Sequence, residues 1–138
     1  MESAYDFEGR AQRKFGDLRK VQLEPRDVNI KGVAKKFDMV SADNKYVGDA
    51  KKLNRGSPTA GPDSGERSFI AEYVWLLQHF APGEHKFIVF GHDEDDDRIT
   101  AAWIRKYAQV AEGVAFYFLT RQGSINLWSR GQWMSYPS

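Results

Sequence analysis

The stretch that decides the fold runs from residue 35 to residue 52 and reads KKFDMVSADNKYVGDAKK. Two strand-like runs, residues 33–42 and 45–53, flank Asp43 and Asn44. Both of these residues tolerate the positive φ that a tight turn requires. The sequence therefore predicts a β-hairpin with Asp43 and Asn44 at its tip.

This turn sets the register of the hairpin, because the numbers of directly opposed residues then sum to 87. Opposed residues share a face of the sheet. One face is predicted to carry the pairs Val40 with Val47, Asp38 with Asp49, and Lys36 with Lys51. The other face is predicted to carry Lys35, Phe37, Met39 and Ser41 against Tyr46, Gly48, Ala50 and Lys52.

The predicted register places the carboxylates of Asp38 and Asp49 opposite each other, with Cβ atoms roughly 5 Å apart. Opposed like charges destabilise a hairpin by up to about 1 kcal/mol, unless a divalent cation lies between them. Oxygen ligands without Cys or His suit Mg²⁺ or Mn²⁺. Lys51 projects from the same face and can orient a water or stabilise charge on a phosphate. The alternative is a solvated cluster of salt bridges on an exposed sheet face.

The pattern Phe37-Asp38 followed by Asp49-Ala50-Lys51 resembles the PD-(D/E)xK nuclease superfamily, although Phe37 stands where that family has proline. The resemblance covers roughly residues 3–90. It implies an α/β, restriction-endonuclease-like fold, with a mixed β-sheet and flanking helices. In that family one helix precedes the hairpin, and a helix and a strand follow it.

The resemblance also implies roles for individual residues. Asp38 and Asp49 correspond to the metal ligands, and Lys51 to the lysine that positions or activates the attacking water. Glu8, on the helix before the hairpin, corresponds to a further acid that completes the metal shell. A solvated glutamate is the alternative for Glu8.

Outside the hairpin, hydrophobic spacing predicts a helix over residues 3–20 with Ser3 as N-cap, and a short strand or a loop over 21–32. Residues 54–65 form a predicted loop. Asp63 and Glu66 resemble a capping box for a buried helix whose apolar face includes Phe69 and Tyr73. Strands are predicted at 86–90, 114–119 and 125–128. Asp97 is predicted to cap a further helix, and the tail after Arg130 to be irregular.

The composition of the 138 residues favours one globular domain, residues 1–138. The absence of cysteine excludes a disulfide scaffold, a thiolate nucleophile and any Cys-containing metal site. The longest apolar run is too short for a membrane span, and no signal peptide is evident. We therefore expect a soluble cytoplasmic protein that does not associate with membranes.

The positive charge is concentrated in the first part of the chain. Residues 1–60 contain 13 Lys or Arg and 9 Asp or Glu, whereas the remaining residues contain 7 and 10. Such asymmetry is compatible with a basic face that contacts phosphates, and ordinary solvated surface is the alternative. The candidate nucleic-acid-binding residues are Lys35, Lys36, Lys52, Arg55, Arg13 and Lys14.

The family resemblance implies an expected function, an Mg²⁺-dependent endodeoxyribonuclease that hydrolyses DNA phosphodiester bonds. The family resemblance further implies a homodimer, because cutting two strands needs two sites. One alternative is a non-catalytic nucleic-acid-binding or assembly module of the same fold, and another is a protein-interaction domain with incidental carboxylates. The acidic run after His92, residues 93–97, lacks the glycine and distant glutamate of an EF-hand, so a solvated acidic loop is expected there.

Overall fold

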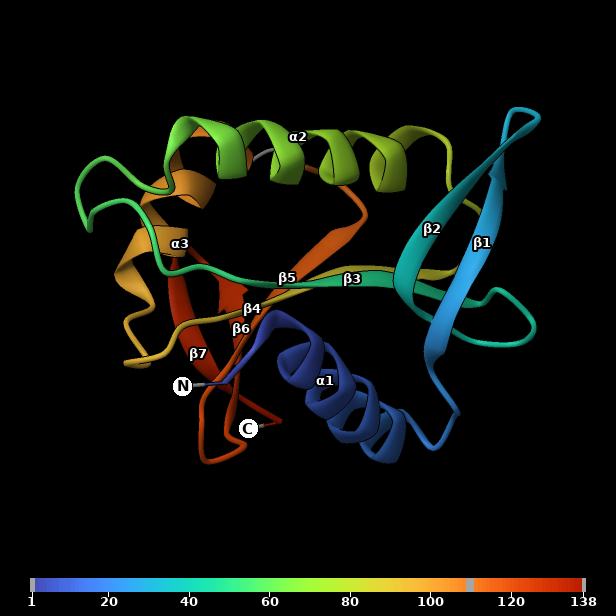
Figure 1. Ribbon diagram of the computed structural model, residues 1–138, viewed down its shortest axis with the longest axis horizontal. Coiled ribbons are helices and arrows are strands. Elements are labelled where there is room, and N and C mark those ends of the chain that lie inside the picture. Colours follow the sequence, from blue (N-terminus) through green and yellow to red (C-terminus); the bar gives the residue numbers. More distant parts are fainter. Residues whose placement is uncertain (1, 109–110, 138) are drawn as a thin grey trace.

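The computed structural model describes residues 2–108 and 111–137 and has one seven-stranded sheet, in which the strands lie in sequence order (Figure 1). β3, β4 and β5 are parallel to one another, and the other neighbouring pairs are antiparallel. The strands are β1 (Glu24–Ile30), β2 (Val33–Val40), β3 (Tyr46–Lys52), β4 (His85–Gly91), β5 (Val114–Leu119), β6 (Ile125–Ser129) and β7 (Gln132–Tyr136).

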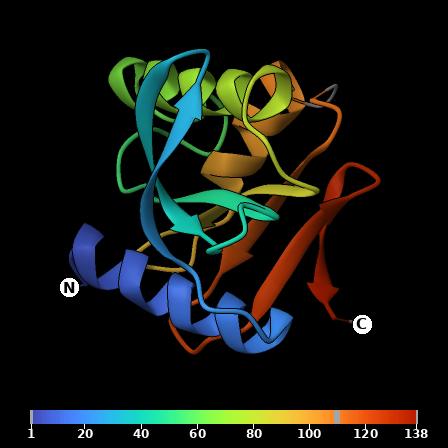
Figure 2. The ribbon, with the colours of Figure 1, turned by 90° about the vertical axis from the view of Figure 1, so that its right-hand side faces the viewer.

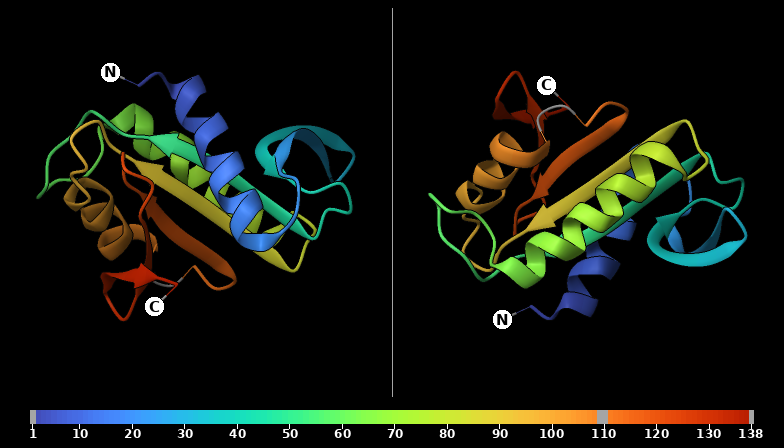
Figure 3. Two further views of the ribbon diagram at one scale, coloured as in Figure 1. Left: turned by 90° about the horizontal axis from the view of Figure 1, so that it is seen from below. Right: turned by 90° about the horizontal axis from the view of Figure 1, so that it is seen from above.

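Helices cover both faces of this sheet. α1 (Ala4–Arg19) crosses one face, and α2 (Ser64–His79) lies along β3 and β4 on the other (Figure 3). α3 (Arg98–Trp103) continues into a π-helical turn, η1 (Ile104–Ala108). The predicted class, an α/β fold with a mixed sheet and flanking helices, is therefore confirmed. The order of elements up to β4 is also the order that the family resemblance implies.

The two faces of the sheet bury separate apolar clusters. On the α1 side, Phe7, Ala11 and Phe15 pack with Met39 and Ala50. The cluster on the α2 side includes Ile70, Val74, Leu77, Phe37, Val40, Val47, Ile88 and Phe90. In the described part of the chain, no helix is both long enough and apolar enough to cross a membrane.

Local capping signals locate three helix starts correctly, and the capping hydrogen bond forms at two of them. The Ser3 hydroxyl accepts a hydrogen bond from the backbone N–H of Asp6, and the Asp63 carboxylate accepts one from the N–H of Glu66, both at 3.0 Å. Asp97 precedes α3 as predicted, but its side chain makes no capping bond. Its backbone is helical rather than extended, and the extended form is what turns a capping side chain towards the first turn.

The predicted hairpin register is confirmed where β2 and β3 pair, because Met39 lies opposite Gly48 and Val40 opposite Val47. The predicted length of the pairing is wrong, since no other β2–β3 pairs form. From Phe37 back to Val33, β2 pairs with β1 alone, and Lys36 lies opposite Asp27 rather than Lys51. The β1–β2 hairpin therefore splays away from β3 (Figures 1 and 2).

This divergence also changes which way Phe37 points. Strict alternation assigns Phe37 to the face of Met39, yet Phe37 packs in the α2-side cluster together with Val40. A register shift in the β1–β2 ladder, between Glu24 and Arg26, lies next to residues 38 and 39. Such an irregularity breaks the two-residue alternation locally.

Of the two alternatives predicted for residues 21–32, the strand forms, and the tail predicted to be irregular also contains a strand. Residues 24–30 become β1, with Pro25 at the edge of the sheet, where a missing N–H is tolerated. Residues 132–136 become β7, which pairs antiparallel with β6. Trp128 and Trp133 lie opposite each other in the β6–β7 hairpin, with ring centroids 5.1 Å apart.

Gly48, next to Asp49, has no room for a side chain. A Cβ atom there would lie 2.6 Å from the ring of Phe87. We expect Gly48→Ala to lower the free energy of unfolding by about 1–3 kcal/mol through overpacking, measured by urea denaturation. Gly65→Ala is the matched control, because its Cβ would meet only Asp63 at 3.8 Å, and alanine favours the helix by up to about 1 kcal/mol. Equal effects of the two substitutions would contradict this packing argument.

Candidate active site

Asp38 and Asp49 come together at the point where β2 and β3 diverge. The backbone N–H of Asp38 donates to Oδ1 of Asp49 at 3.1 Å, and the N–H of Ala50 donates to Oδ2 of Asp38 at 3.2 Å. Each carboxylate thus uses one oxygen to bind the backbone of the opposite strand. These two bonds lie just beyond the last backbone pair, Met39 with Gly48, and bridge the opening between the strands.

The pKa of Asp49 is raised to about 9 by this environment. Burial is the largest cause, because the residue is only 5% exposed. A hydrogen bond with the Asp38 carboxyl group and the negative charge of that group raise the pKa of Asp49 further, as does the charge of Glu8, whereas the backbone N–H of Asp38 lowers it. Two carboxyl groups this close cannot both ionise easily without a cation, so the pair holds a proton at neutral pH.

Glu8 reaches the same place from α1. One turn further along the helix, Gln12 Nε2 donates to the backbone carbonyl of Asp38 at 2.9 Å, which ties α1 to β2 at this residue. The pKa of Glu8 is raised, first by burial and next by the charge of Asp38, while Lys36 and Lys51 oppose the shift. The sequence-predicted acids therefore share one electrostatic environment.

The opposite wall of the site comes from α2. The ammonium of Lys51 lies 4.7 Å from the ring centroid of Phe69. The Tyr73 hydroxyl donates to the backbone carbonyl of Lys36 at 3.1 Å. Burial, followed by the charges of Asp49 and Asp38, raises the pKa of Tyr73 to about 12, so the phenol stays protonated and can act only as a neutral donor or acceptor.

The donor set fits a hard divalent cation only in part. Asp38 and Asp49 supply converging carboxylate oxygens, the ligand type that Mg²⁺ and Mn²⁺ prefer. In residues 2–108 and 111–137, however, no three His, Asp or Glu side chains are arranged so as to hold one ion. Glu8 therefore lies near the pair without completing a three-carboxylate cage.

The predicted phosphate-binding cations occupy several different environments. Lys36 is exposed on β2 near Glu8, and Arg55 is 82% exposed on the loop before α2. Lys35 pairs with Glu72 at 3.0 Å. Both α1 cations are exposed, but they line different grooves. Arg13 shares a groove of about 370 Å³ with Glu8, whereas Lys14 lines one beside the β6–β7 hairpin.

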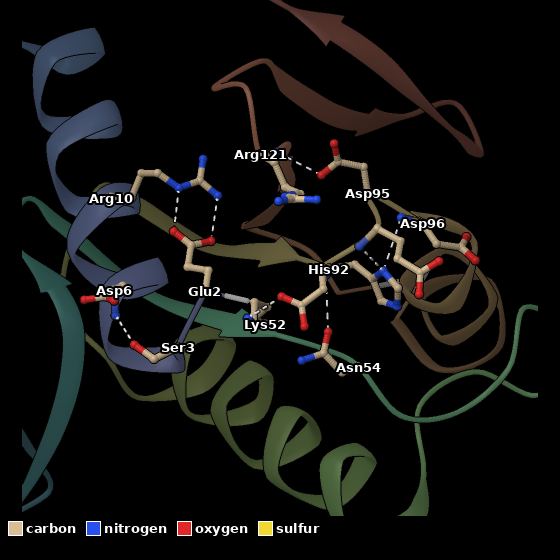
Figure 4. A network of polar contacts seen from close by, with 12 residues as sticks. Glu2, Ser3, Asp6, Arg10, Lys52, Asn54, His92, Asp95, Asp96 and Arg121 are labelled. Carbon is tan, nitrogen blue, oxygen red and sulfur yellow. Dashed lines mark hydrogen bonds and ion pairs between the residues drawn. The ribbon is translucent and has the colours of Figure 1, made fainter.

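Lys52 lies apart from these cations. Its side chain is only 5% exposed, and its ammonium pairs with Asp93 at 2.5 Å, beside Glu2, Arg10 and His92 (Figure 4). Strand alternation places Lys52 on the opposite face from Lys51, where the carboxylate of the loop after β4 meets it. Its inclusion among the phosphate contacts is not supported by this placement.

The acidic run after β4 is organised by hydrogen bonds within the loop. Nδ1 of His92 accepts bonds from the backbone N–H groups of Glu94 and Asp96 (Figure 4). Asp96 pairs with Arg98, which holds the pKa of that carboxyl at about 2, and Asp95 accepts from the N–H of Arg121. These bonds give the run a structural role beside α3.

Sequence reasoning missed the contribution of α2 to the site. Phe69 was assigned to the buried face of this helix but is 41% exposed. Glu66, Phe69 and Tyr73 follow the spacing i, i+3 and i+7, which places them along one side of the helix. That spacing is visible in the sequence, but the strand residues that it faces are fixed only by the tertiary structure.

The fold and the acidic pair together define an α/β protein with a carboxylate site at a split between two strands. No protein-family model matches the chain, and no curated protein sequence matches it. Among solved structures, it is similar to SfsA of Pyrococcus furiosus in complex with Ca²⁺, with 17% identity and a TM-score of 0.41. The alignment covers 86% of this chain and 57% of SfsA, so the chain spans little more than half of that protein. At this level of similarity, the roles of residues rest on the geometry of the site itself.

Proposed function

We propose that this protein is a metal-dependent endonuclease that hydrolyses DNA phosphodiester bonds. The observation that carries the proposal is that Asp38 meets the buried Asp49, whose pKa is raised to about 9, first by burial and next by the Asp38 carboxyl group. Two carboxyl groups in this arrangement cannot both ionise without an electrostatic cost, and a divalent cation that neutralises both charges would remove that cost.

In this proposal Asp38 and Asp49 would hold one Mg²⁺ or Mn²⁺ ion, with Glu8 as a further acid in the same electrostatic environment. When bound, such an ion polarises a phosphate and lowers the pKa of a coordinated water. The other roles belong to side chains. Lys51 orients the attacking water or offsets the negative charge that develops on the phosphate. Lys36, Arg13 and Arg55 contact phosphates of the DNA backbone.

The experiment that tests this function incubates the purified protein with supercoiled, linear and branched DNA in Mn²⁺ or Mg²⁺. We expect nicked or cut products that disappear when EDTA is added. Because several cations would contact phosphates, DNA binding is expected to weaken steeply between 50 and 200 mM salt, by about tenfold or more.

The same experiment separates the alternatives. Salt-sensitive DNA binding in EDTA, with no cleavage in either metal, would identify a non-catalytic nucleic-acid-binding module. The absence of both binding and cleavage would instead favour a protein-interaction domain. The non-catalytic alternative has a specific structural basis. Where β2 diverges from β3, the two carboxylates hold the strands together through backbone hydrogen bonds, and this role requires no catalysis.

A further inference from the structure

Lys51 is held by a surface aromatic ring that the proposed chemistry does not itself require. Its ammonium lies over Phe69, 4.7 Å from the ring centroid, within the range of a cation–π contact. Phe69 belongs to neither apolar cluster of the core and is 41% exposed. A large apolar side chain at the surface, placed against a lysine of the acidic site, indicates a role in holding that lysine.

A carboxylate on the same side of α2 accompanies the ring. Oε1 of Glu66 is buried and has no hydrogen-bond partner among the residues that the structure describes. Burial, followed by the charge of Asp63, raises the pKa of Glu66, and the positive charge of Lys51 acts against this shift. Glu66 is therefore within electrostatic reach of Lys51, and also of Arg55, whose charge and backbone N–H act on its pKa in the same direction.

The ring of Phe69 is itself fixed relative to the acids. It packs against Tyr73 with ring centroids 4.8 Å apart, and Tyr73 meets the fully buried Phe37 edge-on at 5.3 Å. The Tyr73 hydroxyl also binds the backbone carbonyl of Lys36. This chain of contacts links β2, which carries Asp38, through α2 to Lys51 on β3. It thereby crosses the region where the two strands no longer pair.

We propose that Phe69 is a positioning residue that holds the ammonium of Lys51 at the acidic site, and that the nearby charge of Glu66 makes a weaker contribution. The proposal rests on the proposed nuclease function. A lysine side chain has four rotatable carbon bonds, and an unrestrained ammonium samples many positions. A displacement of about 1 Å at a reacting group can lower a rate a hundredfold, so a ring that restricts the ammonium acts on the rate.

The kinetic test compares Phe69→Leu, Phe69→Tyr and Glu66→Gln for cleavage of supercoiled DNA in Mn²⁺. We expect Phe69→Leu to lower kcat about tenfold with KM unchanged, and Phe69→Tyr to restore most of it, because tyrosine keeps the aromatic face. Glu66→Gln is expected to lower kcat less. Trp75→Leu is the matched control on α2, because Trp75 is 54% exposed and packs with Phe80, away from Lys51.

A second measurement does not depend on cleavage. The ε-methylene protons of Lys51, assigned by comparison with Lys51→Arg, should show an upfield ring-current shift in the NMR spectrum. Phe69→Leu should remove this shift, whereas Trp75→Leu should leave it intact. Absence of the shift in the wild-type protein would overturn the proposal, even if the protein cleaves DNA.

The remaining outcomes are also decisive. If the shift is present and DNA is cleaved, but Phe69→Leu turns over at the wild-type rate, the ring does not position the lysine for catalysis. If the wild-type protein cleaves no DNA in either metal, the proposed function fails and the catalytic part of this inference fails with it. In that case the lysine shift alone decides whether Phe69 holds the ammonium.

Discussion

Asp49→Ala is expected to lower the rate of DNA cleavage by at least about a hundredfold, and Asp38→Ala by a similar factor. Both residues supply oxygens to the same proposed cation, so the loss of either carboxylate is expected to abolish the cation site. The double variant should be little slower than either single variant, because residues that act together are not additive. The measurement is single-turnover nicking of supercoiled DNA in Mn²⁺.

The choice of variants guards against loss of the fold. The Asp49 carboxylate accepts a bond from the N–H of Asp38, and alanine cannot replace it. Asp49→Asn keeps an acceptor of the same shape while removing the charge, so it should be as inactive as Asp49→Ala and remain folded. Glu94→Gln, in the exposed acidic loop, is the control and should cleave at the wild-type rate. Cleavage that survives in Asp49→Asn would refute the assignment of the site.

Asp49→Asn is also expected to stabilise the metal-free protein, and the gain should increase with pH. The folded-state pKa of Asp49, about 9, lies above its value of 3.8 in an unfolded chain. The folded protein therefore binds the proton more tightly. The contribution of Asp49 to the free energy of unfolding is complete below about pH 4 and declines as pH rises towards 9. Asparagine resembles the protonated acid and removes this decline, and each unit of pKa difference corresponds to about 1.4 kcal/mol.

Urea denaturation in EDTA at pH 5, 6, 7 and 8 measures this effect. We expect the two proteins to converge towards pH 4 and to differ by more than about 2 kcal/mol at pH 8. Asp96→Asn provides a control of opposite sign, because Arg98 holds the pKa of Asp96 at about 2 and its ionised form stabilises the fold above about pH 4. A constant difference between wild type and Asp49→Asn across this range would mean that Asp49 is ionised in the metal-free fold.

Addition of Mn²⁺ at pH 8 should reduce the difference in the free energy of unfolding between the wild-type protein and Asp49→Asn. An ion that binds only the folded state stabilises it by about 2.7 kcal/mol at a hundredfold excess over its dissociation constant. Only the wild-type protein retains both acids, so its unfolding midpoint should rise with Mn²⁺ while that of Asp49→Asn stays nearly constant. Equal responses of the two proteins would place the ion elsewhere.

The part of the site that the sequence predicts is local in origin. The turn at Asp43 and Asn44 fixes a register in which opposed residue numbers sum to 87, and both pairs of the β2–β3 ladder obey it. Asp38 and Asp49 come next in that register, and bonds from each carboxylate to the opposite backbone take the place of a ladder pair there. The N-caps at Ser3 and Asp63 are equally short-range, and each side chain accepts a hydrogen bond from a backbone N–H of the first helical turn.

The parts that could not be predicted depend on partners far along the chain. Lys36 does not face Lys51, because β1, whose strand character was ambiguous in the sequence, captures this end of β2. Lys52 lies in an ion pair with Asp93, which comes 41 residues later. Periodicity places Phe69 on an apolar side of α2, but whether that side is covered depends on where β2 leaves the sheet.

The short β2–β3 ladder has a mechanical consequence. Two residue pairs form the only strand pairing between the β1–β2 hairpin and the five remaining strands in the described part of the chain. A ladder of two residue pairs resists bending far less than the five-residue and seven-residue ladders on either side of β4. Asp38 lies on β2 and Asp49 on β3, on either side of this short ladder. An ion bound by both carboxylates would therefore restrict the motion of the β1–β2 hairpin relative to the other five strands.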